Sequence, residues 1–139
     1  MGCREQPPSP SLSDMIPDGT SASIVLTVAQ TDTAVALGSG DVTVLGTPRI
    51  VALCEEAAVA ALAGFLPEGT TTVGTSINID HFAATAVGGS VTATATVSEV
   101  DGRRISFTLV VEDGDKTAAS GTHTRFVVDR ALFEESAIN

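Results

Sequence analysis

Residues 47–69 read TPRIVALCEEAAVAALAGFLPEG, and this stretch decides the fold. Thr is a good residue to cap the start of a helix, Pro is preferred at the first helical position, and Ala and Leu dominate the residues after them. Thr47 is therefore expected to cap a helix that runs from about residue 48 to about residue 65 and stops before Pro67.

The predicted helix is apolar nearly all round, because its only charges after Arg49 are those of Glu55 and Glu56. A helix on the surface of a globular protein shows a polar half. We therefore expect this helix to be buried on most of its sides.

The segments on either side of the helix favour strands. Apolar runs predict two short strands before the helix, and alternating patterns predict four longer strands after it. Asp-Gly pairs between the later strands are strong hairpin signals. In the first long strand, every second residue from Val73 to His81 is expected on one face. The predicted strands cover residues 23–28, 33–37, 72–82, 90–100, 104–112 and 117–128.

This order predicts an α+β fold in which an antiparallel sheet of about five strands wraps around one long central helix. The four strands after the helix are expected to form a meander. A curled sheet leaves one side of the helix bare, so we expect a second copy of the chain to cover it in a homodimer. A short final helix is expected near Asp129.

The beginning of the chain differs in composition from the rest. Its first fourteen residues, MGCREQPPSPSLSD, predict a disordered leader, taken as residues 1–20, before a single domain over residues 21–139. They lack the apolar core of a secretory signal. Cys3 and Cys54 are too few for a disulfide framework, so we expect a cytoplasmic location.

Charge and composition exclude several classes of function. The chain has 139 residues, with 7 Lys+Arg against 17 Asp+Glu and a formal net charge of -10. A basic face for nucleic acid is therefore not expected, and the aromatic platforms that stack single-stranded bases are missing. No apolar run approaches the roughly 18 residues of a membrane span. We expect no metal and no cofactor, because no Cys/His cluster has metal spacing and no phosphate-binding Gly motif occurs.

Three residues are candidates for chemistry, and each has an ordinary structural alternative. His81 shares strand parity with Ile77 and Ile79, so it points toward the helix, either as a reactive group or as a core-edge His bonded to a backbone carbonyl. Glu55 has apolar helical neighbours that desolvate its carboxylate, or it faces solvent or an Arg. Thr47 could bind or attack a substrate, although a capping role already explains it.

Two further sites carry weaker signals. His123 alternates with other polar residues of the last strand, as ordinary strand polarity would. Arg103 and Arg104 lie at a predicted hairpin tip, where a charged pair is usually solvated.

Several segments together resemble one known family. The stretch from Thr47 to Glu55 and the segments VGTSINIDHFAAT, VDGRRISFTLVVEDG and SGTHTRFVV are similar to the fluoroacetyl-CoA thioesterase family of hotdog-fold proteins. The resemblance covers about residues 42–133 and implies hydrolysis of a short-chain acyl-CoA thioester to free acid and CoA. The family's fluoroacetyl enzyme has a Phe-bearing lid just before the helix. This chain has GSGDVTVLG there, so another short acyl group is an equally good expectation.

The resemblance also implies roles for particular residues. In the family, a Thr before the central helix, a Glu eight residues later and a His at a strand end form the catalytic set, which corresponds to Thr47, Glu55 and His81. It also implies that Gly74 lies against the substrate and that Arg125 lies near the acyl pocket.

An acyl-CoA substrate brings several phosphate charges to an acidic chain, so local cations must hold them. Arg103 and Arg104 are the expected pair, helped by backbone N–H groups.

The implied mechanism has Thr47 binding or attacking the thioester carbonyl, Glu55 acting as base or nucleophile, and His81 moving protons to the leaving thiolate. Eight residues of helix span about 12 Å, so Thr47 and Glu55 cannot touch within one straight helix. Either the helix begins after Thr47, or a second copy supplies one of the two. The alternatives are a non-catalytic acyl-binding protein and, less favoured, a hotdog hydratase, whose characteristic Gly-Asp-x-Asn-Pro motif is absent.

Overall fold

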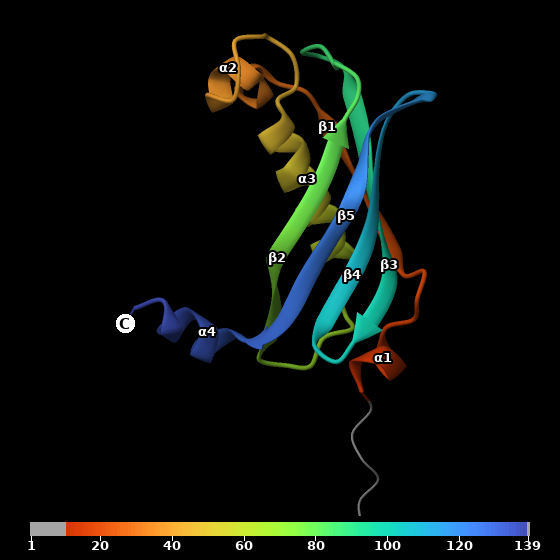
Figure 1. The fold of residues 1–139 in the computed structure, drawn as a ribbon, viewed down its shortest axis with the longest axis vertical. Helices are drawn as coiled ribbons and strands as arrows, with labels where there is room; N and C mark the ends of the chain where they lie inside the picture. The colour runs from red at the N-terminus through yellow and green to blue at the C-terminus, as the bar shows by residue number, and fades with distance from the viewer. Residues whose placement is uncertain (1–10, 139) are drawn as a thin grey trace, which may run out of the picture.

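The computed structural model describes residues 11–138. A curled antiparallel sheet of five strands packs one face against a long helix, α3, and leaves its other face free of helices (Figure 1). This arrangement confirms the expected α+β fold, with the sheet wrapped around a central helix. The elements are α1 (Leu12–Met15), β1 (Ser21–Thr27), the 3-10 turn η1 (Gln30–Asp32), α2 (Ala34–Leu37), α3 (Thr47–Ala61), β2 (Thr70–His81), β3 (Ser90–Asp101), β4 (Arg104–Asp113), β5 (Lys116–Asp129) and α4 (Arg130–Ser136).

Helix α3 starts one residue earlier and ends sooner than the sequence indicated. Gly46 occupies the N-cap position with an extended backbone, and Thr47 is the first helical residue rather than the cap. The backbone N–H of Gly46 donates to the carbonyl of Asp32 at 2.9 Å, which fixes the entry of the chain into the helix. The helix ends at Ala61 instead of residue 65, because Gly64 adopts a φ of +85° that no longer continues it.

Helix α3 is buried on one side only, so the prediction of burial on most sides is wrong for a single chain. The side facing the sheet is formed by Ile50, Leu53, Cys54, Ala57, Ala58 and Ala61, all of them buried. The opposite side carries Ala52 and Val59, which are exposed. We call this surface the open side of α3. Covering it by a second copy of the chain stays a prediction.

The sheet has the strand order β1-β3-β4-β5-β2, which departs from the predicted four-strand meander. β3, β4 and β5 are joined by hairpins as expected. β2 pairs with β5 rather than with β3, so the segment from residue 82 to residue 89 crosses the end of the sheet. The crossing places β2 at one edge and β1 at the other (Figure 1).

Two local predictions need correction. Residues 33–37 form the N-cap and the whole of helix α2 and not a strand, because the Thr33 side chain accepts a hydrogen bond from the backbone N–H of Ala36 and caps a single turn. In β2, a bulge at Thr75 shifts the pairing between Gly74 and Ser76. Because of this extra residue, Ile77 and Gly74 both lie on the inward face of the strand although they are three residues apart. Val73 therefore lies on the other face.

The alternation in β3 and β4 agrees with the sequence pattern. Val91, Ala93, Ala95 and Val97 of β3 are buried, as are Ile105, Phe107, Leu109 and Val111 of β4. The short helix expected near Asp129 is α4, capped by the Asp129 side chain, and Figure 1 shows it extending away from the sheet.

The N-terminal segment is more ordered than a leader over residues 1–20 implies. Residues 1–10 lie outside the described part of the chain. Residues 11–20 include α1, which has a capping box at Ser11, and Ile16, which is only 1% exposed and belongs to the hydrophobic core. Ile16, together with the partly buried Leu12 and Met15, thus anchors a segment whose composition favours disorder.

Replacing Ile16 by Ala should lower the free energy of unfolding by about 2–5 kcal/mol, since a large aliphatic side chain leaves a fully buried site. Urea denaturation followed by circular dichroism measures the change. Ser13→Ala, at an exposed position of the same segment, is the matched control and should change stability by less than about 0.5 kcal/mol. Equal stability of the wild type and Ile16→Ala would contradict the anchoring role.

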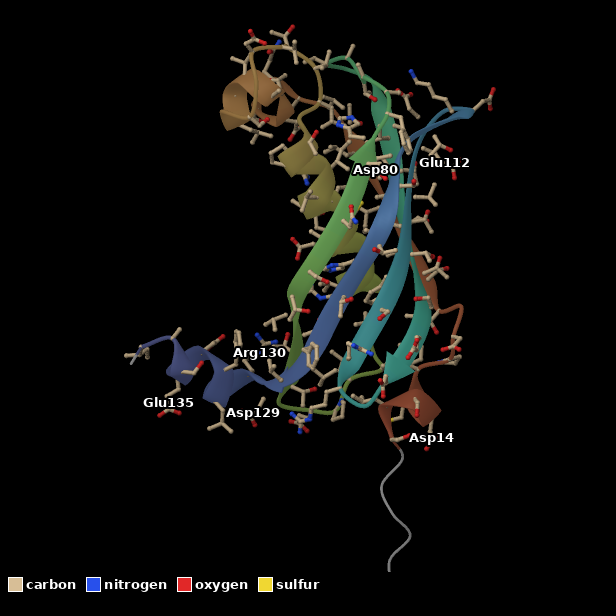
Figure 2. All side chains as sticks on the ribbon, in the orientation of Figure 1. Asp14, Asp80, Glu112, Asp129, Arg130 and Glu135 are labelled. Carbon is tan, nitrogen blue, oxygen red and sulfur yellow. The ribbon has the colours of Figure 1, made fainter. Side chains whose placement is uncertain are left out.

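The acidic side chains lie at both ends of the sheet. Figure 2 shows Asp80 and Glu112 near one end, and Asp14 and Glu135 near the other.

Within residues 11–138, no helix is long and apolar enough to cross a membrane.

Candidate active site

The first part of the candidate site lies where the start of α3 meets the end of β2. The hydroxyl of Thr47 is 2.8 Å from Nδ1 of His81. Because Gly46 holds the cap position, this hydroxyl is free from capping and is available to the imidazole. Nε2 of His81 is buried and has no hydrogen-bond partner within residues 11–138. A buried polar atom without a partner is costly in a folded protein, which marks this ring as a functional candidate.

A hollow of about 320 Å³ opens beside the Thr47–His81 pair. Its wall consists of the loop between α2 and α3, including residues 39–42, and of residues 82–84 after β2. Phe82, which comes directly after His81 in the chain, is an aromatic side chain of this wall and is 62% exposed. The loop before the helix contributes no aromatic ring, as its sequence shows.

The second part of the site lies further along α3. An oxygen of the Glu55 carboxylate, Oε2, accepts a hydrogen bond from Nη1 of Arg125 at 3.1 Å. Arg125 is inside the protein, on β5, with 8% of its side chain exposed, whereas 40% of the Glu55 side chain remains exposed. The remaining guanidinium donors of Arg125 reach Thr72 on β2, through Nε to the hydroxyl at 2.9 Å and through Nη2 to the carbonyl at 3.1 Å.

Gly74 makes room for this ion pair. A side-chain Cβ at position 74 would lie 2.6 Å from Oε2 of Glu55, 3.1 Å from Cε1 of His123 and 3.2 Å from Nη1 of Arg125. Real Cβ atoms do not approach other atoms as closely as the first of these distances. Gly74 therefore leaves the space that the Glu55 carboxylate and its partner occupy.

The two parts of the site do not meet within one chain. Thr47 belongs to α3 itself, so the alternative in which the helix begins after Thr47 is wrong. Thr47 and Glu55 are then about 12 Å apart along the axis. A separate hollow of about 510 Å³ lies beside Glu55 and Arg125, on the open side of α3.

The structure places Arg103 and Arg104 away from the Thr47–His81 pair. They are exposed at the β3–β4 hairpin, and Nη2 of Arg104 is 3.2 Å from Asp101. Arg104 pairs with Phe126 of β5, whereas His81 pairs with Ala119 of the same strand. These two positions of β5 are seven residues apart, which corresponds to about 23 Å along the strand. Within a single chain these two side chains do not lie near the Thr47–His81 pair, and their contact with CoA stays a prediction.

Two residues contact Arg125 that the sequence did not assign to it: Thr72, which was not named, and His123, which was named only as a weaker candidate. Thr72 binds the guanidinium with its hydroxyl and its carbonyl, and Nε2 of His123 is 3.1 Å from Nη1 of Arg125. His123 had the necessary signal, because it shares strand parity with Arg125 and with the apolar Val127. Thr72 could not be found, because the bulge in β2 reverses its expected face.

Cys54 precedes Glu55 but is unsuited to nucleophilic chemistry. Burial, with the nearby Glu55 charge, raises the pKa of the Cys54 thiol to about 11. The thiolate is the reactive form, so this thiol is inert near neutral pH. Within residues 11–138, no three His, Cys, Asp or Glu side chains lie close enough together to hold a metal ion.

Comparison with known proteins identifies a family for this chain. The family model described as fluoroacetyl-CoA-specific thioesterase, FlK, matches residues 28–131. A fluoroacetyl-CoA thioesterase from Streptantibioticus cattleyicolor is 42% identical over 90 residues, which are 65% of this chain and 65% of that protein. The chain thus aligns with slightly less than two thirds of this relative.

Solved structures share the fold. A structure of the fluoroacetyl-CoA thioesterase FlK superposes with a TM-score of 0.82 at 32% identity, covering 87% of this chain and 94% of that one. A hot-dog-like protein from Thermanaerovibrio acidaminovorans gives a TM-score of 0.83 at 27% identity, with 91% and 93% covered. An FlK variant in complex with fluoroacetate and CoA gives 0.79 at 33% identity, with 84% and 98% covered.

The family match spans most of the chain, including α3, the crossing segment and all strands from β2 to β5. Thr47, Glu55, Gly74, His81 and Arg125 all lie within it. The chain belongs to the fluoroacetyl-CoA-specific thioesterase (FlK) family of hotdog-fold proteins.

Proposed function

We propose that this protein hydrolyses short-chain acyl-CoA thioesters to the free acid and CoA. Water adds to the thioester carbonyl, the carbon–sulfur bond breaks, and the departing thiolate takes up a proton. The observation that carries the proposal is the 2.8 Å contact between the Thr47 hydroxyl and Nδ1 of His81, at the mouth of a hollow and inside a thioesterase-family fold.

Thr47 and His81 have complementary roles in this proposal. The imidazole accepts the hydroxyl proton when Thr47 attacks the carbonyl, or orients the hydroxyl when it binds the carbonyl oxygen. In the first case His81 passes this proton to the sulfur of CoA, and water then hydrolyses the acyl ester left on Thr47. In the second case the Glu55 carboxylate takes a proton from the attacking water, and His81 donates a proton to the sulfur of CoA. Nε2 of the same ring is buried without a partner among the described residues, so the ring must turn before this atom can contact an additional group.

We propose that this additional group is the Glu55 carboxylate of a second copy in a homodimer. Within one chain Glu55 is bound to Arg125 and lies about 12 Å along α3 from Thr47. The 40% of the Glu55 side chain that is exposed faces the open side of α3, which is the surface that a second copy is expected to cover. A carboxylate contacting a His ring stabilises the imidazolium that forms during proton transfer.

A panel of acyl-CoA substrates tests the activity directly. The protein is incubated with acetyl-, fluoroacetyl-, propionyl- and butyryl-CoA, and a thiol reagent reports the release of CoA. Release well above the rate given by the Thr47→Ala variant, which lacks the hydroxyl and whose folding is checked by circular dichroism, supports a thioesterase. Binding of an acyl-CoA without thiol release would support a non-catalytic acyl-binding protein instead, and hydration of an enoyl-CoA would support a hydratase.

The acyl group is expected to be short, and the same panel identifies the preferred one. The hollow at Thr47 measures about 320 Å³, and its loop wall is lined by small and aliphatic residues and by Asp41. Selectivity for fluoroacetyl-CoA is not required by this lining. The cytoplasmic location stays a prediction that rests on the cysteine count and on the first residues.

A further inference from the structure

The contacts of His123 support one inference that rests on the proposed function and deepens it. His123 lies on β5, two residues before Arg125, and is 2% exposed. Its Nδ1 is 2.7 Å from the carbonyl oxygen of Ser76, and its Nε2 is 3.1 Å from Nη1 of Arg125. Nη1 of Arg125 in turn donates to Glu55 at 3.1 Å. These contacts form a continuous chain from β2 through β5 to α3.

The partners of His123 fix which ring nitrogen carries the proton. A carbonyl oxygen can only accept, so Nδ1 must carry a hydrogen and donate it to Ser76. A guanidinium can only donate, so Nε2 must be unprotonated and accept from Arg125. His123 therefore serves this arrangement only as a neutral imidazole with the proton on Nδ1.

We propose that His123 is a positioning residue that accepts a hydrogen bond from Nη1 of Arg125 and so holds the guanidinium toward the Glu55 carboxylate. Thr72 fixes the guanidinium through Nε and Nη2, and His123 fixes Nη1. Without the imidazole acceptor, Nη1 loses its second contact, and the guanidinium is held less firmly, by Thr72 and Glu55 alone.

The ring of His123 is itself held in place by the fold. It stacks on Phe107 of β4, with ring centroids 5.9 Å apart and an interplanar angle of 28°. The Ser76 carbonyl lies immediately after the bulge at Thr75, so this irregularity in β2 presents the acceptor that sets the ring orientation. A bulge next to a functional group commonly has this role of redirecting a strand.

Burial of His123 favours the neutral ring. Burial lowers the pKa of His123 from its ordinary value, and the Arg125 cation acts in the same direction, while the bond to Ser76 and the Glu55 charge act against them. Arg125 on its own strand and Glu55 on α3 are the charged groups that act on it; β4 presents the Phe107 ring and β2 presents the Ser76 carbonyl. The imidazole is therefore available as an acceptor at neutral pH.

A pair of variants tests the proposal in the acyl-CoA assay. His123→Phe keeps a ring against Phe107 but removes the acceptor, and it should lower kcat by roughly 10- to 100-fold with a KM within about threefold of wild type, because a misplaced catalytic group costs rate more than binding. His123→Gln restores an oxygen acceptor and should recover most of this loss. Thermal unfolding of both variants controls for stability.

A spectroscopic measurement tests the same contacts without relying on activity. The chain has two His residues, so ¹⁵N-labelled imidazole signals are assigned by comparing wild type with His123→Gln. We expect His123 to show the tautomer with the proton on Nδ1 at neutral pH, and the Arg125 guanidinium to give resolved Nη–H signals because its rotation is restricted. Resolved signals in the wild type should merge in His123→Phe.

The two measurements separate failure of this proposal from failure of the proposed function. Hydrolysis by the wild type with unchanged kcat in His123→Phe would overturn the positioning role and leave the thioesterase proposal standing. No hydrolysis of any acyl-CoA would end the thioesterase proposal, and the tautomer and guanidinium signals would still decide whether His123 holds Arg125. A proton on Nε2, or an imidazolium at neutral pH, would overturn the inference even if His123→Phe fails to fold.

Discussion

The His81→Ala variant is expected to hydrolyse acyl-CoA with a kcat/KM about 100- to 10,000-fold below that of the wild type, the range that a lost general acid–base residue typically costs. His81 contacts the Thr47 hydroxyl at 2.8 Å, so its removal leaves the hydroxyl without a proton acceptor and the departing thiolate without a proton donor. The measurement is steady-state thiol release with the best substrate of the panel.

Asp80→Ala is the matched control for this variant. Asp80 precedes His81 on β2, is exposed, and belongs to the opposite face of the strand, where Figure 2 shows it. We expect its rate to stay within about twofold of wild type, as for surface substitutions in general. If His81→Ala and Asp80→Ala both retain full activity, His81 has no part in the chemistry and the assignment of the site is wrong.

The Glu55→Gln variant is expected to lose about 100-fold or more in kcat, because an amide cannot act as a base or hold the charge of an imidazolium. The change keeps the size of the side chain and an oxygen for Arg125. Glu56→Gln is the control, since Glu56 is the adjacent, exposed carboxylate and pairs with Arg49 at 3.1 Å instead. Comparable losses in both variants would indicate a general effect of charge on α3 rather than a role of Glu55.

Mixing two inactive variants tests whether the site is shared between copies. Co-expressed Thr47→Ala and Glu55→Gln chains should form mixed dimers that contain one site with all residues intact. Random pairing makes about half of the dimers mixed, each with one intact site of two, so about a quarter of the wild-type activity should return. Absence of recovery from mixed dimers, verified by mass spectrometry with distinct tags, would place the complete site within one chain.

The sequence predicted the core of this fold because most of its signals are local. The alternation in β3 and β4, the Asp-Gly hairpins and the apolar run of α3 depend on neighbouring residues only. The position of β2 does not, because a segment of eight residues, 82–89, could join it either to the adjacent strand or across the sheet. Residues 33–37 are short and apolar, a composition shared by strands and single helical turns, and the Thr33 cap decided between them.

In the candidate site, too, the sequence predicts what depends on local signals and not what depends on long-range pairing. Thr47, Glu55 and His81 could be named from their surroundings in the sequence, and Thr47 and His81 are in contact in the structure. The arrangement around Arg125 could be predicted only in part. His123 is two residues from Arg125 on the same strand, whereas Thr72 and Glu55 are distant in sequence. Thr72 reaches the guanidinium only because β2 pairs with β5.

The bulge at Thr75 has a consequence for how β2 tolerates changes in length. Gly74 pairs with Arg125 and Ser76 pairs with the neighbouring Thr124, so Thr75 is the extra residue of the strand. Loss of one residue at the bulge would leave a regular strand in which Gly74 and His81 still face α3. Loss of one residue between Ile77 and His81 would instead turn one half of the strand over. β2 can therefore lose one residue at the bulge without changing which of its side chains face α3, whereas the loss of a residue elsewhere in the strand reverses part of it.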